Sequence, residues 1–235
     1  MIIGMRGHDF GRMEPRALAL AIREAGFEAT QLAFAKAFPA PAEQYMTPGA
    51  LSEIRSAFAG IVLPVMGCYV SASDRDPDVL AEAKARFKRS LSASVILGAG
   101  CVGTETTHFT FPESEREAAY ARLLDFTREV CAHAEQVHAL VGIEPVALHT
   151  LNTPELTRRL IADVSSPNLR VILDTANLVT PETAAPEAFD ARKDTSTSER
   201  DAPSERTSTD STPSQEISSM RTHDTAANAN TATIH

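Results

Sequence analysis

Two acidic residues, one structural repeat apart, each close a short apolar run. Glu144 follows residues 141–143 and Asp174 follows residues 171–173. Continuous apolar runs are typical of parallel strands buried on both faces, and in an α/β barrel the residue leaving the C-terminal end of a strand points into the active-site mouth. Carboxylate oxygens suit hard divalent cations such as Mg²⁺ or Mn²⁺. The pattern therefore predicts that Glu144 and Asp174 are ligands of a divalent metal cation.

Short apolar runs alternate with amphipathic segments along the first 182 residues. Strands are expected at residues 2–6, 27–34, 61–66, 101–106, 141–146 and 169–173, with helices starting near residues 15, 48, 77, 113 and 153. Such βα alternation predicts a parallel sheet covered by helices. Six units fill about 180 residues, whereas eight would need about 240, the usual size of a (β/α)₈ barrel. The predicted fold class is α/β, of the (β/α)₈ TIM-barrel type, incomplete, with six βα units followed by a disordered tail.

The composition changes abruptly after Glu182. From residue 183 to residue 235 the large apolar residues are Phe189, Ile217, Met220 and Ile234, among many Ser, Thr, Asp, Glu, Arg and Ala. This composition buries too little apolar surface to offset the entropy cost of ordering the chain. The predicted organisation is a truncated barrel over residues 1–182 and a disordered low-complexity tail over residues 183–235. A frameshift would produce such a switch, and the other two reading frames of the gene test this.

Charge and cysteine usage limit the partners and the compartment. The net charge of −9 argues against binding nucleic acid, because nucleic-acid binders present a basic face. Cys68, Cys101 and Cys131 are odd in number and widely spaced, which favours reduced thiols in a cytoplasmic protein. No apolar run suits a signal peptide or a membrane span, so no membrane partner is expected.

Several motifs occur in an order and spacing that resemble one family. They are residues 4–10, 26–32, 66–69 and 97–106, and above all the stretch from Ile143 to Leu178. Together they resemble the sugar phosphate isomerase/epimerase family of xylose isomerase-like TIM barrels. The resemblance implies a small sugar or sugar phosphate as the substrate. It also implies proton abstraction next to a carbonyl, with the metal ligand Glu144 acting as the base.

The family's metal has four ligands, at the ends of strands five to eight, and this sequence supplies the first two. The family's seventh strand typically ends in His-x-Lys-Asp after an apolar run, and no such segment occurs here. The nearest equivalents, Lys193-Asp194 and His223-Asp224, do not follow a strand pattern. The resemblance therefore implies an incomplete metal site.

Other polar residues follow the predicted strands. His8, Glu105, His108 and His149 would face the same mouth as substrate-binding groups, although loops collect polar residues whatever their function. Asn177 is also a candidate substrate-binding residue, and it either hydrogen-bonds Asp174 or shapes the following turn. The basic residues from Lys84 to Arg89 are explained by a solvated helix face.

Two classes of function remain open. The first is a metal-dependent sugar isomerase or epimerase. The second is a catalytically inactive barrel remnant or binding scaffold, in which unpaired strand edges promote self-association. The endonuclease branch of the same barrel type needs a His-rich three-metal site and a basic groove, and the sequence shows neither.

Overall fold

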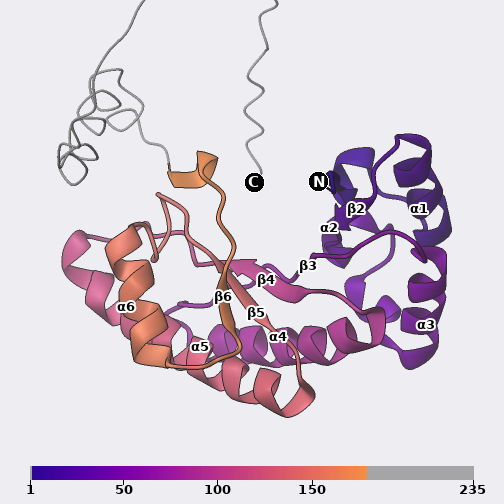
Figure 1. Cartoon of the computed structure of the whole chain (residues 1–235). Helices are drawn as coiled ribbons and strands as arrows, with labels where there is room; N and C mark the ends of the chain where they lie inside the picture. Colours follow the sequence, from indigo (N-terminus) through magenta and orange to yellow (C-terminus); the bar gives the residue numbers. More distant parts are fainter. Residues whose placement is uncertain (1, 179–235) are drawn as a thin grey trace, which may run out of the picture. The chain divides into compact units, whose positions relative to one another are not determined.

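The computed structural model describes residues 2–178, in which strands and helices alternate (Figure 1). The strands are β1 (Gly4–Arg6), β2 (Ala29–Gln31), β3 (Val65–Gly67), β4 (Cys101–Glu105), β5 (Val141–Glu144) and β6 (Leu169–Val171). The α-helices are α1 (Pro15–Glu24), α2 (Phe34–Ala37), α3 (Pro48–Ala57), α4 (Pro77–Leu97), α5 (Arg116–Val137) and α6 (Pro154–Val164). Short 3₁₀ turns are η1 (Gly7–Phe10), η2 (Ala42–Met46), η3 (Glu113–Glu115) and η4 (Ala176–Leu178). The predicted tail, residues 183–235, lies outside the described residues.

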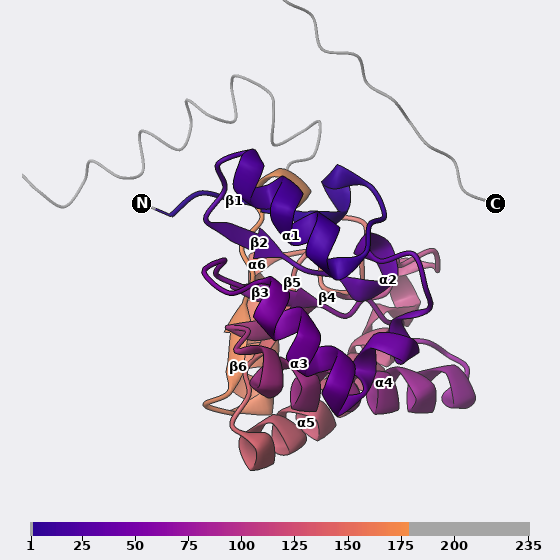
Figure 2. The same ribbon diagram turned by 90° about the vertical axis from the view of Figure 1, so that its right-hand side faces the viewer.

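The strands pair in parallel and in chain order. β1 pairs with β2, and β3, β4, β5 and β6 form a four-stranded sheet. Parallel bridges from Ala29 to Val62 and from Leu32 to Met66 join the two sheets. Successive helices pack against each other, with α1 against α3 and α4 between α3 and α5, as Figure 2 shows from the side. This arrangement confirms the predicted α/β fold with six parallel strands.

Proline begins four of the helices and polar caps fix three of the starts. Pro occupies the first turn of α3, α4 and α6, where its missing N–H costs no hydrogen bond. The preceding residues Thr47, Asp76 and Thr153 accept backbone N–H bonds with their side chains. Pro15 begins α1 without a side-chain cap. The helix starts predicted from sequence are therefore close to those observed.

Some element boundaries differ from the sequence prediction. The strand predicted at residues 27–34 stops at Gln31, and Phe34 instead begins α2, where it is buried. The strand predicted at residues 61–66 is regular from Val65, because Pro64 has no N–H to donate. The carbonyls of Leu63 and Pro64 still accept hydrogen bonds from Gly100 and Cys101. The chain therefore keeps its place beside β4.

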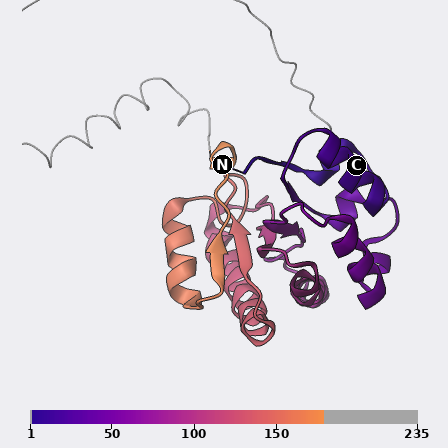
Figure 3. The same cartoon turned by 45° about the vertical axis from the view of Figure 1, so that its right-hand side comes forward.

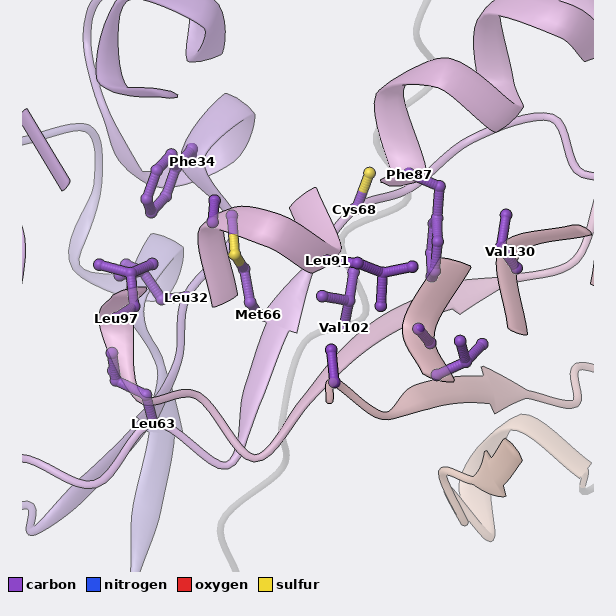
Figure 4. Close-up of a cluster of buried hydrophobic side chains, with 14 of the residues drawn as sticks. Leu32, Phe34, Leu63, Met66, Cys68, Phe87, Leu91, Leu97, Val102 and Val130 are labelled. Carbon is purple, nitrogen blue, oxygen red and sulfur yellow. The ribbon is translucent and has the colours of Figure 1, made fainter. Parts of the chain in front are cut away.

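The hydrophobic core lies between the sheet and the helices. Phe87 and Leu91 of α4 pack on the β3 and β4 side chains Met66 and Val102, all at most 2% exposed (Figure 4). Phe87 also meets Phe126 of α5 edge to face, with ring centroids 5.6 Å apart. Burial of this kind supplies most of the stability that holds the strand ends in place.

A row of glycines crosses the opposite face of the sheet. Gly67, Gly103 and Gly142 are in register on β3, β4 and β5. A Cβ at Gly103 would lie 2.6 Å from Cδ1 of Ile172, and one at Gly142 would lie 2.8 Å from the same atom. The missing side chains thus leave room for Ile172, which follows β6. Ile172 therefore fills the space that side chains at positions 103 and 142 would occupy.

None of the helices among residues 2–178 is long and apolar enough to cross a membrane. The three cysteines are free; Cys68 and Cys131 are buried and Cys101 is half-buried.

Candidate active site

Polar side chains gather at the C-terminal ends of the strands. Because the strands are parallel, these ends lie along the same edge, which we call the mouth. Glu105 and Glu144 are the last residues of β4 and β5 and are partners in register. Figure 3 shows β5 and β6 side by side, so that Asp174, which follows β6, lies in the segment next to Glu144. The structure therefore brings the predicted strand-end carboxylates to one edge.

Glu144 has an environment suited to proton transfer. The residue is 8% exposed, and its Oε1 accepts a 2.6 Å hydrogen bond from Nδ2 of Asn177. Burial raises the pKa of Glu144, and the negative charges of Glu105 and Asp174 raise it further. The hydrogen bond from Asn177 lowers this pKa and so opposes the rise. A carboxylate that holds a proton more readily than usual can both accept and return one.

Asn177 acts on Glu144 and not on Asp174. Its side chain donates to Glu144, and its backbone carbonyl accepts a 2.8 Å bond from the N–H of Ala147. Asp174 uses Oδ1 to accept the N–H of Ala176 at 2.9 Å. Sequence analysis left open whether Asn177 bonds Asp174 or shapes the turn. The side chain instead donates to Glu144, because the turn after β6 carries the amide back to β5.

Two carboxylates are available for the predicted metal. Asp174 is exposed and raises the pKa of both Glu144 and Arg6, so its charge is felt across the mouth. Their oxygens suit a hard divalent cation, and such an ion would relieve the repulsion between them. Within residues 2–178 no three His, Cys, Asp or Glu side chains form a metal-binding group. The described residues thus fit half of a ligand set, and Lys193-Asp194 and His223-Asp224 lie outside them.

A bridge between two loops brings Glu105, His108 and His149 close together. His108 and His149 form an antiparallel bridge, and their rings meet edge to face with centroids 5.6 Å apart. Nε2 of His149 lies 3.8 Å from Oε2 of Glu105. Burial lowers the pKa of His149 and so favours the neutral imidazole. The negative charge of Glu105 opposes this shift. A neutral ring can both donate and accept hydrogen bonds, as binding of sugar hydroxyls requires.

His8 lies in η1 on the β1 side of the mouth. It is half-buried, and burial lowers its pKa with a further contribution from Lys36. Among the described residues, Nδ1 of His8 and Nδ1 of His149 are buried atoms without a hydrogen-bond partner. Buried polar atoms are normally satisfied, so both nitrogens are candidates for ligand contacts.

Sequence analysis missed Lys36 and Tyr69 at the same mouth. The Tyr69 hydroxyl accepts a 2.8 Å hydrogen bond from Gln31, and Nζ of Lys36 lies 3.7 Å from the Tyr69 ring centroid. Burial raises the pKa of Tyr69, and the charges of Glu144 and Glu105 raise it further. The available signal was their position just after the second and third strands.

Residues 19–200 match the xylose isomerase-like TIM barrel family. The chain belongs to this family. Its fold is similar to that of 3-keto-D-glucoside 4-epimerase from E. coli, with 17% identity, a TM-score of 0.66 and coverage of 83% of this chain and 76% of that one. This result confirms both the predicted TIM-barrel type and the resemblance stated from sequence.

Two further structures share the fold. D-psicose 3-epimerase from Clostridium cellulolyticum H10, solved with D-tagatose, has 18% identity, a TM-score of 0.64 and coverage of 81% of this chain and 69% of that one. A xylose isomerase-like TIM barrel protein from Mycobacterium smegmatis, solved with magnesium, has 18% identity, a TM-score of 0.60 and coverage of 80% and 69%. No curated protein matches the sequence.

Proposed function

We propose that this chain is an isomerase or epimerase of small sugars that uses Glu144 as the base and a divalent metal cation. The observation that carries the proposal is the buried Glu144 carboxylate at the end of β5, which is held by Asn177 and has a raised pKa. Family membership supports it, as do the similar folds of two sugar epimerases.

The reaction begins at the carbon next to the sugar carbonyl. Glu144 takes the proton, the C–H electron pair moves towards the carbonyl carbon, and the carbonyl oxygen becomes the oxyanion of an enediolate. Burial and the charge of Glu105 stabilise the protonated form of Glu144, which can then return the proton. Return of the proton by Glu144 to the neighbouring carbon gives isomerisation. Epimerisation needs a proton delivered to the same carbon from the opposite face of the enediolate, and therefore a second acid on that face.

The metal and the surrounding side chains have separate roles. Glu144 and Asp174 would hold the cation, whose positive charge would stabilise the developing oxyanion. Glu105, His8, His108 and His149 offer hydrogen bonds to the sugar hydroxyls. Asn177 fixes the Glu144 carboxylate, which reduces the reorganisation needed at the moment of proton transfer.

Deuterium exchange tests the proton transfer directly. The full chain is incubated with D-psicose, D-tagatose or D-fructose in deuterated buffer with Mg²⁺ or Mn²⁺, and ¹H NMR follows loss of the proton next to the carbonyl. A positioned carboxylate base contributes roughly 10²–10⁴-fold, so Glu144→Gln should slow exchange by at least about 100-fold. Glu155→Gln, at an exposed residue of α6 that pairs with Arg158, is the control and should keep the full rate.

Calorimetric titration with Mn²⁺ tests the cation site separately. We expect binding by the unchanged chain and its loss in Glu144→Gln and Asp174→Asn. Absence of both exchange and Mn²⁺ binding would reject the proposal and favour a catalytically inactive binding scaffold.

A further inference from the structure

The basic residues of α4 do not all form the solvated face that the sequence suggested. Nζ of Lys84 pairs with Asp125 and Glu129 of α5 at 2.5 and 2.7 Å, and its side chain is 15% exposed. Lys88 pairs with Glu129 at 2.6 Å. These cations join α4 to α5 on the outer side of the domain.

Arg86 lies among these residues and differs from them. Arg89 pairs with Glu82 at 2.8 Å, whereas Arg86 has no carboxylate within salt-bridge distance among residues 2–178. Its side chain is half-buried. A partly desolvated guanidinium without an anion has unused hydrogen-bonding capacity, and its planar array of donors matches an oxyanion.

Arg86 lines three cavities. One is also lined by Asp78 and Glu82 of α4, and the other two share Tyr69. One of these two, of about 380 Å³, lies at the mouth and is also lined by Glu105, Thr107 and His108. The other, of about 350 Å³, lies between α2, η2 and α4 and is also lined by Lys36, Arg89 and Ser90. Arg86 therefore stands where the mouth adjoins a second cavity.

The second cavity is lined by both basic and apolar residues. Phe34, Met66 and Cys68 form part of its wall, and Figure 4 shows all three. Burial raises the pKa of the Cys68 thiol, and the charges of Arg86 and Arg89 act against this rise. Their field thus reaches the wall of the cavity. Glu43, an exposed residue of η2, is an acidic group that also lines it.

We propose that Arg86 forms a subsite for a phosphate monoester and that this phosphate belongs to the sugar bound at the mouth. Glu105, whose charge acts on Glu144, lines the mouth cavity together with Arg86, and Arg86 also lines the second cavity with Lys36. A sugar phosphate has the matching polarity, since hydroxyls and a carbonyl lie at one end and a dianion at the other. The assignment rests on the proposed function for the sugar end, whereas the anion subsite rests on Arg86 and the cavities alone.

Calorimetry on the full chain with Mg²⁺ tests this subsite, with D-fructose 6-phosphate, D-fructose and inorganic phosphate as probes. Charge-assisted hydrogen bonds predict that the unchanged chain binds the sugar phosphate about 10- to 100-fold tighter than the free sugar. Arg86→Gln should erase this difference and leave the affinity for D-fructose unchanged. Arg86→Lys should keep part of the preference. Arg158→Gln, at an exposed arginine of α6, is the control.

Several outcomes would overturn the subsite. They are binding of neither sugar, no preference for the phosphate, or equal weakening of both sugars by Arg86→Gln. Inorganic phosphate that binds as tightly as the sugar phosphate would show a site for free anion and reject the assignment to substrate. The deuterium exchange reports separately on Glu144: Arg86-dependent binding without exchange would support the subsite and reject the proposed reaction.

Discussion

The hydrogen bond from Asn177 to Glu144 should contribute more stability as the pH rises. Asn177→Ala removes the donor but keeps the backbone carbonyl that binds Ala147. Glu144 is 8% exposed, so water replaces the lost donor poorly. A hydrogen bond to a charged group contributes about 1.5–3 kcal/mol, and a neutral one about 0.5–1.5 kcal/mol. We therefore expect the larger loss of stability when Glu144 is ionised and the smaller one when it is protonated.

The pH dependence of this loss of stability follows from the pKa of Glu144. Burial and Glu105 raise this pKa above the ordinary glutamate value of 4.5, so the unchanged chain loses stability as the pH rises from that value through the folded pKa. The bond from Asn177 favours the ionised form, and its removal raises the pKa further. The cost of Asn177→Ala should therefore grow as the pH rises through the same window.

Urea unfolding of the metal-free chain between about pH 4 and pH 8 measures this cost, with EDTA present throughout. Asn168→Ala is the matched control, because Nδ2 of Asn168 donates a 2.7 Å bond to the backbone carbonyl of Ala139, which does not titrate. The control should lose about 0.5–1.5 kcal/mol at every pH. Parallel curves for the two variants would refute the reasoning, because they would show that Asn177 does not discriminate between the two forms of Glu144.

Three further predictions concern the packing around the site. In urea unfolding, Phe87→Ala should lower the free energy of unfolding by about 3–5 kcal/mol, because Phe87 is fully buried. Phe87→Leu should lower it by less than about 1.5 kcal/mol, and equal losses would contradict this prediction. Gly100→Ala should lower the free energy of unfolding by about 1–3 kcal/mol, because its Cβ would lie 2.7 Å from the carbonyl oxygen of Pro64. Gly49→Ala is the control: its Cβ would meet no atom within 4 Å, so the same assay should show no loss of stability. Since Leu173 after β6 is 71% exposed and no described strand pairs with the outer edge of β6, sedimentation velocity should show concentration-dependent self-association, and a monomer at all concentrations would exclude it.

The sequence by itself determined the order of the elements and the residues at the strand ends. Apolar runs and helix-starting prolines depend on local periodicity and backbone chemistry, so six βα units could be predicted before any contact was known. Glu144 and Asp174 followed from the same patterns, because a parallel strand has one C-terminal end. The prediction for residues 183–235 lies outside the described residues and stays a prediction.

The tertiary structure alone decided which side chains meet. Asn177 reaches Glu144 from 33 residues away, and Ser73 reaches Thr150 from 77 residues away. Such distances along the chain carry no periodic signal. The environments of Lys36 in α2 and Arg86 in α4 were missed for the same reason, since a basic residue on a helix looks alike in sequence whether it faces solvent, a carboxylate or a cavity. The register of the strands and the packing of α4 on the sheet fix these environments, and both depend on contacts between distant segments.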